Sequence, residues 1–296
     1  MKRLLVLACI LGLSGAAVWY GQRRNDETRI APNGGINLIA DSERELSRVP
    51  MRLTRLSDNE EISVGDEIAR EYLSSNVRPE TQAQALVEQV GAELAERAHR
   101  KLPYRFHLVD NPYFVNAFAL PGGHVFVGRG LLNLMDTKDE LAAVLGHELE
   151  HIDHYHCAER VQLQQRTRDI PLAQLALLPV EIFEAGYSKE QELEADREGS
   201  RLAMQAGYSP EGAIRTFQKL DALYHEDVKR DRTPQGELSR VALQSIFDYF
   251  RSHPEPPERI AQLERLMAEE RWARPPEQAL PRELIAVGSM AKSHSR

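Results

Sequence analysis

A cluster of histidines places the strongest constraint on how this chain folds. Four of its ten histidines, His147, His151, His154 and His156, fall within ten residues. Residues 137–140 just before them read TKDE, the S/T-x-x-E form of a capping box, so a helix is expected to start there and run through the cluster. Residues four apart on a helix share one face, so His147 and His151 can direct both imidazoles at one metal ion.

Composition excludes several classes of protein. The chain has 296 residues, 42% hydrophobic and 28% charged, which suits one large or two small domains with a buried core rather than a disordered chain. The net charge is −8 and no long basic block occurs, so no nucleic-acid partner is expected. Cys9 and Cys157 are the only cysteines, which excludes a disulfide scaffold and a cysteine-rich zinc module.

The N-terminus predicts export from the cytoplasm. Lys2 and Arg3 precede an apolar run of 17 residues from Leu4 to Tyr20, and small residues allow cleavage after Ala16. An uncleaved anchor is the alternative, because a run of this length is at the lower limit for spanning a bilayer. Such an anchor would associate the protein with a membrane. Lipidation of Cys9 is the least favoured alternative.

Hydrophobic periodicity predicts an α+β fold that is mainly helical. We expect helices at 62–72, 81–101, from 137 through the histidine cluster, and from a second capping box at 188–191 to Gly207; strands are expected at 104–109, 114–120 and 124–127. The predicted parts are a signal or anchor at 1–20, a linker at 21–60, a globular domain at 61–270 and a loosely held tail at 271–296. The apolar stretch 170–180 could cover a cleft, touch a membrane or pack in the core, and a mobile cover is favoured.

The residues His147-Glu148-Leu149-Glu150-His151 form an H-E-x-x-H motif. Two histidines at this spacing suit zinc, and Glu148 lies beside them, where its carboxylate can take a proton from a water molecule. The chemistry predicted from this motif is hydrolysis of a peptide bond with one zinc ion per chain.

A catalytic zinc site needs a third ligand from the protein. His154 shares a face with His147, but seven residues of helix separate them by about 10 Å, so His154 and His156 are expected to be structural or surface residues. Glu192 and Asp196 are better candidates, with Glu192 as ligand and Asp196 accepting a hydrogen bond from an imidazole. The alternative is that the acidic residues of 190–198 form a solvated helix face.

Four motifs together resemble the gluzincin family of zinc metallopeptidases that includes the CAAX prenyl protease, HtpX and BepA-type proteases. These are residues 116–123 (NAFALPGG) with the strand after them, the H-E-x-x-H motif, residues 192–196 (ELEAD) as E-x-x-x-D, and His253-Pro254 followed by Arg259-Ile260. His156 falls where the family often repeats a histidine. Glu150 departs from the small residue common in the family motif, and the chain is most similar to the exported BepA-type members without their TPR repeats.

The resemblance implies a zincin-like metalloprotease domain with a small β-sheet bordering the active-site cleft. It implies Glu192 as the third zinc ligand, and it places His253 and Arg259 near the zinc. Either residue would stabilise the oxyanion, or His253 would occupy the open metal position at rest. The 123–128 strand would pair with extended substrate, and the expected substrate-binding residues are Asn116, Gly123, His124, Val125, Phe126 and Val127.

The function expected from these observations is that of a zinc endopeptidase in the bacterial periplasm, soluble or tethered to the inner membrane. Its expected substrates are unfolded or misassembled envelope proteins. Two alternatives remain open, a chaperone-like protein with gated proteolysis and a tethered assembly factor in which the zinc is structural.

Overall fold

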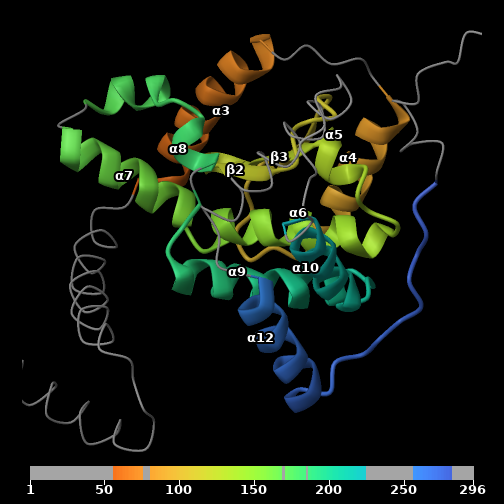
Figure 1. Ribbon diagram of the computed structural model, residues 1–296. Helices are drawn as coiled ribbons and strands as arrows, with labels where there is room; N and C mark the ends of the chain where they lie inside the picture. The colour runs from red at the N-terminus through yellow and green to blue at the C-terminus, as the bar shows by residue number, and fades with distance from the viewer. Residues whose placement is uncertain (1–55, 76–80, 169–170, 185, 225–255, 282–296) are drawn as a thin grey trace, which may run out of the picture. The chain divides into compact units, whose positions relative to one another are not determined.

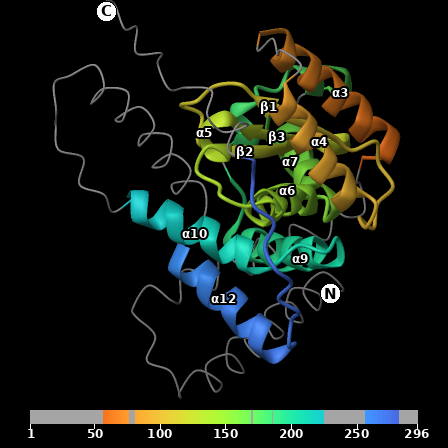
Figure 2. The same ribbon diagram turned by 90° about the vertical axis from the view of Figure 1, so that its right-hand side faces the viewer.

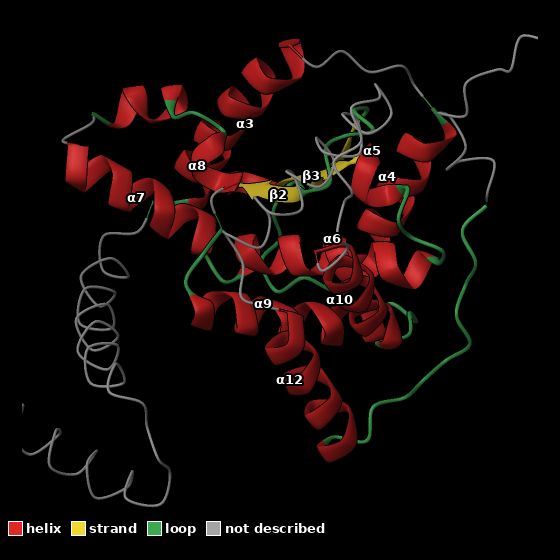
Figure 3. Ribbon diagram, in the orientation of Figure 1, coloured by secondary structure: helices red, strands yellow, loops and turns green. Residues whose placement is uncertain are grey.

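The computed structural model of the chain describes residues 56–75, 81–168, 171–184, 186–224 and 256–281 (Figure 1). Its helices are α3 (Asp58–Ser75), α4 (Gln82–Ala95), α5 (Arg129–Leu132), α6 (Lys138–Asp153), α7 (His156–Arg168), α8 (Glu181–Glu184), α9 (Lys189–Gln205), α10 (Glu211–Tyr224) and α12 (Pro256–Glu269). The strands are β1 (Arg105–Val109), β2 (Ala117–Leu120) and β3 (His124–Gly128), and short 3-10 turns η1 (Pro121–Gly123) and η2 (Leu172–Leu177) complete the described elements. The predicted α+β class with a helical majority is confirmed (Figure 3).

The three strands form a mixed sheet in the order β1-β3-β2. The central strand β3 runs parallel to β1 and antiparallel to β2, so residues 124–127 have a partner on both sides. A strand with both edges paired has no backbone groups left for an added strand. The expectation that substrate pairs with β3 is therefore wrong, and the edges of the sheet belong to β1 and β2.

The sheet is covered on both faces, because successive side chains of a strand point to opposite sides. Phe106, Ala119 and Val125 pack with apolar residues of α4 and α6 in the main core. Phe118 and Phe126 point the other way and pack with Ile68 of α3 in a second cluster. The view in Figure 2 shows the sheet between α3 on one side and α6 on the other.

The predicted capping boxes set the start of both helices that carry the candidate ligands. Thr137 and Glu140 exchange the two bonds of a capping box at the start of α6. Ser188 and Gln191 do the same at the start of α9, which ends before Gly207 in the left-handed region (φ 90°). These two helix starts agree with the sequence prediction because capping depends on residues close together in the chain.

Two glycines allow α6 and α9 to pack closely. A methyl group on Gly146 would lie 2.8 Å from the carbonyl oxygen of Gly199, and one on Gly199 would lie 2.7 Å from the backbone nitrogen of His147. Real Cβ atoms do not approach backbone this closely, so only glycine fits at this crossing. Farther along, His151 near the end of α6 lies beside Glu192 near the start of α9, so the helices are antiparallel.

The helix through the histidine cluster is broken, which the sequence prediction missed. The helix α6 ends at Asp153, Tyr155 adopts the left-handed region (φ 65°), and α7 starts at His156. Other boundaries differ by a few residues, since α3 is longer than predicted and both α4 and β2 are shorter. Tertiary contacts override local periodicity most readily at such ends.

The described part of the stretch 170–180 places two of its leucines in the core, whereas Leu177 is exposed. Leu175 and Leu178 are buried in the second cluster, where Phe183 of α8 also packs. Core packing, the third interpretation of this stretch, therefore agrees with the positions of Leu175 and Leu178.

Part of the predicted loose tail is also docked. Ala279 forms an antiparallel bridge with Thr137, and the backbone N–H of Leu280 donates to the carbonyl of Asp136 at 2.8 Å. Leu280 is buried in the main core because this segment runs across the start of α6.

None of the described helices is long and apolar enough to cross a membrane. The predicted signal or anchor at 1–20 and nearly all of the predicted linker at 21–60 lie outside the described residues.

We predict that Gly199→Ala lowers the free energy of unfolding by about 1–3 kcal/mol, because the added methyl group forces α6 and α9 apart. Urea denaturation measures this change. Gln205→Ala is the control, since Gln205 is exposed on the same helix and its loss should change stability by less than about 0.5 kcal/mol. Equal stability of the two variants would show that the crossing tolerates a side chain.

Candidate metal centre

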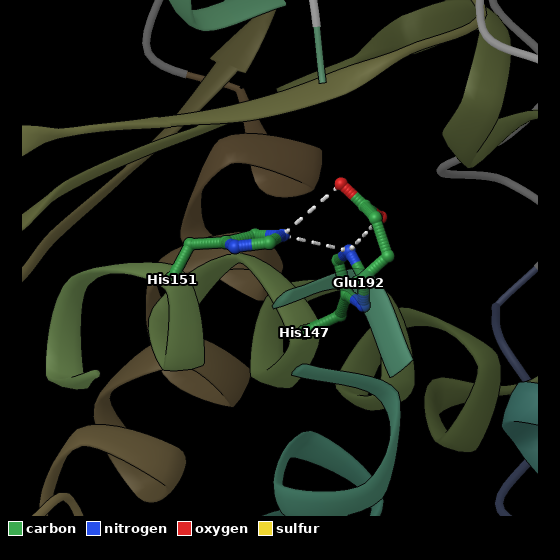
Figure 4. Close-up of side chains that lie close together, drawn as sticks. All are labelled: His147, His151 and Glu192. Atoms are coloured by element: carbon green, nitrogen blue, oxygen red, sulfur yellow. Dashed lines mark hydrogen bonds and ion pairs between the residues drawn. The ribbon is translucent and has the colours of Figure 1, made fainter. Parts of the chain in front are cut away.

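Three side chains from two helices meet with one donor atom each facing the others (Figure 4). Nε2 of His147 lies 3.1 Å from Nε2 of His151 and 3.4 Å from Oε2 of Glu192. Nε2 of His151 lies 3.7 Å from Oε1 of Glu192. The residues expected to be ligands are thus brought together, and all three are buried.

This donor set fits zinc. Ligand bonds of about 2.0–2.2 Å at tetrahedral angles put donor atoms roughly 3.3–3.6 Å apart. The shortest distances between the three side chains, 3.1, 3.4 and 3.7 Å, lie around this range, although the two distances from Glu192 involve different oxygens. Two imidazoles and one carboxylate also leave one of four positions open, as in catalytic zinc sites.

The surroundings of His147 favour a positive charge at this place. Its Nδ1 lies 2.9 Å from Oδ1 of Asp196, so the Nδ1–H donates to this carboxylate and Nε2 is left facing the centre. Burial alone would lower the pKa of His147, but hydrogen bonds to Asp196 and Glu192 outweigh it and raise the pKa to about 9. Asp196 thus makes the contact with an imidazole that the sequence predicted for it.

Arg259 is buried within this network instead of lying on a helix surface. Its Nε donates to Oδ2 of Asp196 at 2.7 Å, a second nitrogen bonds Oδ1, and the guanidinium stacks on Phe217 with 4.1 Å to the ring centre. Burial opposes the charge of Asp196, but Arg259 and His147 together hold the pKa of Asp196 below its usual range. Arg259 therefore keeps Asp196 ionised and fixes its orientation toward His147.

His151 is held by two residues whose contacts the sequence did not predict. Its Nδ1 lies 2.9 Å from Nδ1 of His156, and the ring of Tyr187 stacks on it with centres 4.0 Å apart. The backbone N–H of Tyr187 also donates to Oε1 of Glu192 at 3.0 Å. Tyr187 directly precedes the capping box of α9. This capping box is the sequence feature that could have indicated a well-defined position for Tyr187.

His154 does not belong to the group of three donors. Its Nε2 pairs with Oε2 of Glu150 at 3.1 Å, and its ring is about one-third exposed. The expectation that His154 is a structural or surface residue agrees with this position. His253, the other residue expected near the zinc, lies outside the described residues.

Glu148 lies beside the donors in a protein-walled hollow. It is buried, and burial raises the pKa of Glu148 to about 7. A carboxylate with a pKa near neutrality can both take up and release a proton. Together with His147, Asp196 and Arg259, it lines a cavity whose other walls are mainly apolar residues of β2, α5, α6 and α10.

The residues expected to bind substrate divide between the two faces of the sheet. Val125 and Val127 point into the main core with α6, whereas Phe126 lies in the second cluster on the opposite face. His124 also turns away from the metal centre, since its Nε2 bonds Asp66 of α3 at 2.8 Å.

The two remaining residues of that set directly precede strands, Asn116 before β2 and Gly123 before β3. Oδ1 of Asn116 accepts the backbone N–H of Ala117 at 2.9 Å. Gly123 ends the turn η1, where it occupies the left-handed region (φ 119°).

Comparison with known proteins agrees with this geometry. The profile of peptidase family M48 matches residues 81–185 and 172–267. The chain is 29% identical over 187 residues to a beta-barrel assembly-enhancing protease of Yersinia pestis, covering 56% of this chain and 38% of the relative. It is 29% identical over 178 residues to the mitochondrial metalloendopeptidase OMA1 of Schizosaccharomyces pombe, covering 57% of this chain and 48% of the relative. It is 33% identical over 123 residues to the metalloprotease LoiP of Escherichia coli, covering 37% of this chain and 48% of the relative.

The matched segments amount to less than half of the length of each of these relatives. The family match spans α4 to α12 and includes both histidines of the H-E-x-x-H motif, Glu192 and Arg259. It confirms the expected class of enzyme, a metallopeptidase, and the chain belongs to peptidase family M48.

Proposed function

We propose that this protein is a zinc-dependent endopeptidase that cuts extended segments of polypeptide chains. The observation that supports this most directly is the convergence of His147, His151 and Glu192 at distances suited to zinc, with Glu148 beside them. In this proposal the three converging side chains hold one zinc ion, and Asp196 orients His147.

When bound, zinc acts as a Lewis acid that polarises a carbonyl group and makes water easier to deprotonate. Glu148 takes the proton from the attacking water and delivers it to the leaving amine. Arg259 keeps Asp196 ionised and adds positive potential where the carbonyl oxygen gains charge. We also propose that His253 assists at the oxyanion or occupies the open metal position at rest, as the family resemblance implies.

Two features of the fold favour an extended substrate with an apolar side chain near the bond that is cut. The strand β2 is an edge of the sheet, and its residue Ala117 lines the same cavity as His147 and Glu148. A polypeptide that adds to this edge would therefore pass the metal centre. Val144, Phe217 and Leu220 give the cavity apolar walls suited to an aliphatic or aromatic side chain.

The biological role that we propose is quality control of envelope proteins. Some relatives are named for assisting β-barrel assembly, and residues 1–20 have the pattern of an export signal or anchor. Strand addition selects for unfolded backbone more than for particular residues, which suits a protease that acts on misassembled proteins in the periplasm.

Asp196→Asn should weaken zinc binding by about 10–100-fold, because it removes the negative charge that orients His147. Competition with a chelating indicator gives the dissociation constant. Glu190→Gln is the matched control, since Glu190 is exposed on the same helix and should bind zinc as the wild type does. Unchanged affinity in Asp196→Asn would contradict the assigned role of this carboxylate.

Glu148→Gln should reduce hydrolysis of denatured casein by at least about 100-fold while zinc remains bound, because the amide cannot accept the proton. Release of labelled fragments and the zinc content of the purified protein are measured together. Glu150→Gln makes the same chemical change two residues along the same buried turn and should retain activity. Wild-type rates in Glu148→Gln would rule out the proposed mechanism.

Val144→Phe should change the preference between two peptides that have leucine or alanine next to the cut bond. We expect the ratio of kcat/KM for the leucine peptide to that for the alanine peptide to fall by about tenfold. The larger side chain fills the apolar cavity one helical turn before Glu148. The ratio of kcat/KM for the two peptides is the measurement. An equal effect on both peptides would show that this cavity does not hold the substrate side chain.

A further inference from the structure

The break in the helix after α6 changes which histidines face one another. On a continuous helix, His156 would be rotated by about 140° from His151, and the two rings could not meet. Because Tyr155 adopts the left-handed region, α7 starts in a new direction and His156 becomes its first residue. The rings of His151 and His156 are then 5.1 Å apart between their centres.

The contact between the two rings determines their tautomers. The facing atoms are Nδ1 of His151 and Nδ1 of His156, 2.9 Å apart, so one of them donates and the other accepts. Nε2 of His151 faces the metal centre and must be unprotonated to bind zinc, so the proton of this ring is on Nδ1. His151 is therefore the donor and His156 the acceptor.

A carboxylate fixes the other end of His156. Its Nε2 lies 3.3 Å from Oε2 of Glu194, so the Nε2–H of the neutral ring donates a hydrogen bond to this carboxylate. Glu194 is two residues after Glu192 on α9, so the same helix supplies the third ligand and this anchor. His156 itself is buried.

We propose that His156, held by Glu194, is a positioning residue that orients His151 and keeps its Nε2 available for zinc. The arrangement resembles that of His147 and Asp196, but a neutral imidazole replaces the carboxylate. Residues that bond the outer nitrogen of a histidine ligand commonly account for 10–100-fold in metal affinity. This inference rests on the proposed zinc site and adds a residue whose role neither spacing nor the family match defines.

The test compares two substitutions that keep different halves of the imidazole. In His156→Asn, the amide oxygen is near the position of Nδ1 and can still accept from His151. In His156→Gln, the amide is near the position of Nε2 and faces Glu194 instead. His154→Asn is the matched control, because His154 also approaches Glu194, within 3.6 Å, but pairs with Glu150 rather than with a proposed ligand.

Three quantities are measured: the zinc dissociation constant by chelator competition, the visible spectrum of the cobalt-substituted protein, and the Tm of the metal-free protein. We expect His156→Gln to bind zinc about 10–100-fold more weakly and to alter the cobalt spectrum, with His156→Asn and His154→Asn within about threefold of the wild type. Equal zinc binding by both His156 variants and the wild type would overturn the proposal.

An equal loss of affinity in both His156 variants, with an equal fall in Tm, would also overturn it, since His156 would then act only through packing. The proposed function fails in a different way. A wild-type protein that does not bind zinc would contradict the zinc site itself, whatever the His156 variants do.

Discussion

The close packing of α6 against α9 is the contact on which the rest of the site depends. Gly146 and Gly199 leave no side chain between the two backbones, so Glu192 at the start of α9 reaches both histidines of α6. A wider separation would leave two imidazoles without their carboxylate. The capping boxes define where each helix starts, and the glycine crossing defines where the helices meet.

Charge compensation makes this crossing stable although it is rich in ionisable groups. Burying a lone carboxylate or guanidinium is costly, but Asp196 and Arg259 form a bidentate pair that also contacts His147. The helix α12 supplies Arg259 from far along the chain, so docking of this helix completes the network. The same bonds that satisfy buried charges thus orient the histidine for a metal ion.

The local parts of the site follow well from the sequence. The H-E-x-x-H spacing, both capping boxes and the E-x-x-x-D spacing each depend on residues within one helix, where geometry follows from 3.6 residues per turn. The sequence did not predict the central place of β3, because pairing order depends on contacts between distant segments. It also favoured a cover over a cleft for the stretch 170–180 and a loosely held tail, whereas Leu175 and Leu280 are buried.

The sequence by itself determined that His147 and His151 share a helix face, that Glu148 lies beside them, and that Glu192 and Asp196 share a face of another helix. Only the tertiary structure decided that these faces meet, that Arg259 is buried against Asp196, and that His156 contacts His151. The physical reason is that side-chain spacing within a helix is set by local backbone geometry. Contacts between helices depend on long-range packing and, at Tyr155, on a single left-handed residue.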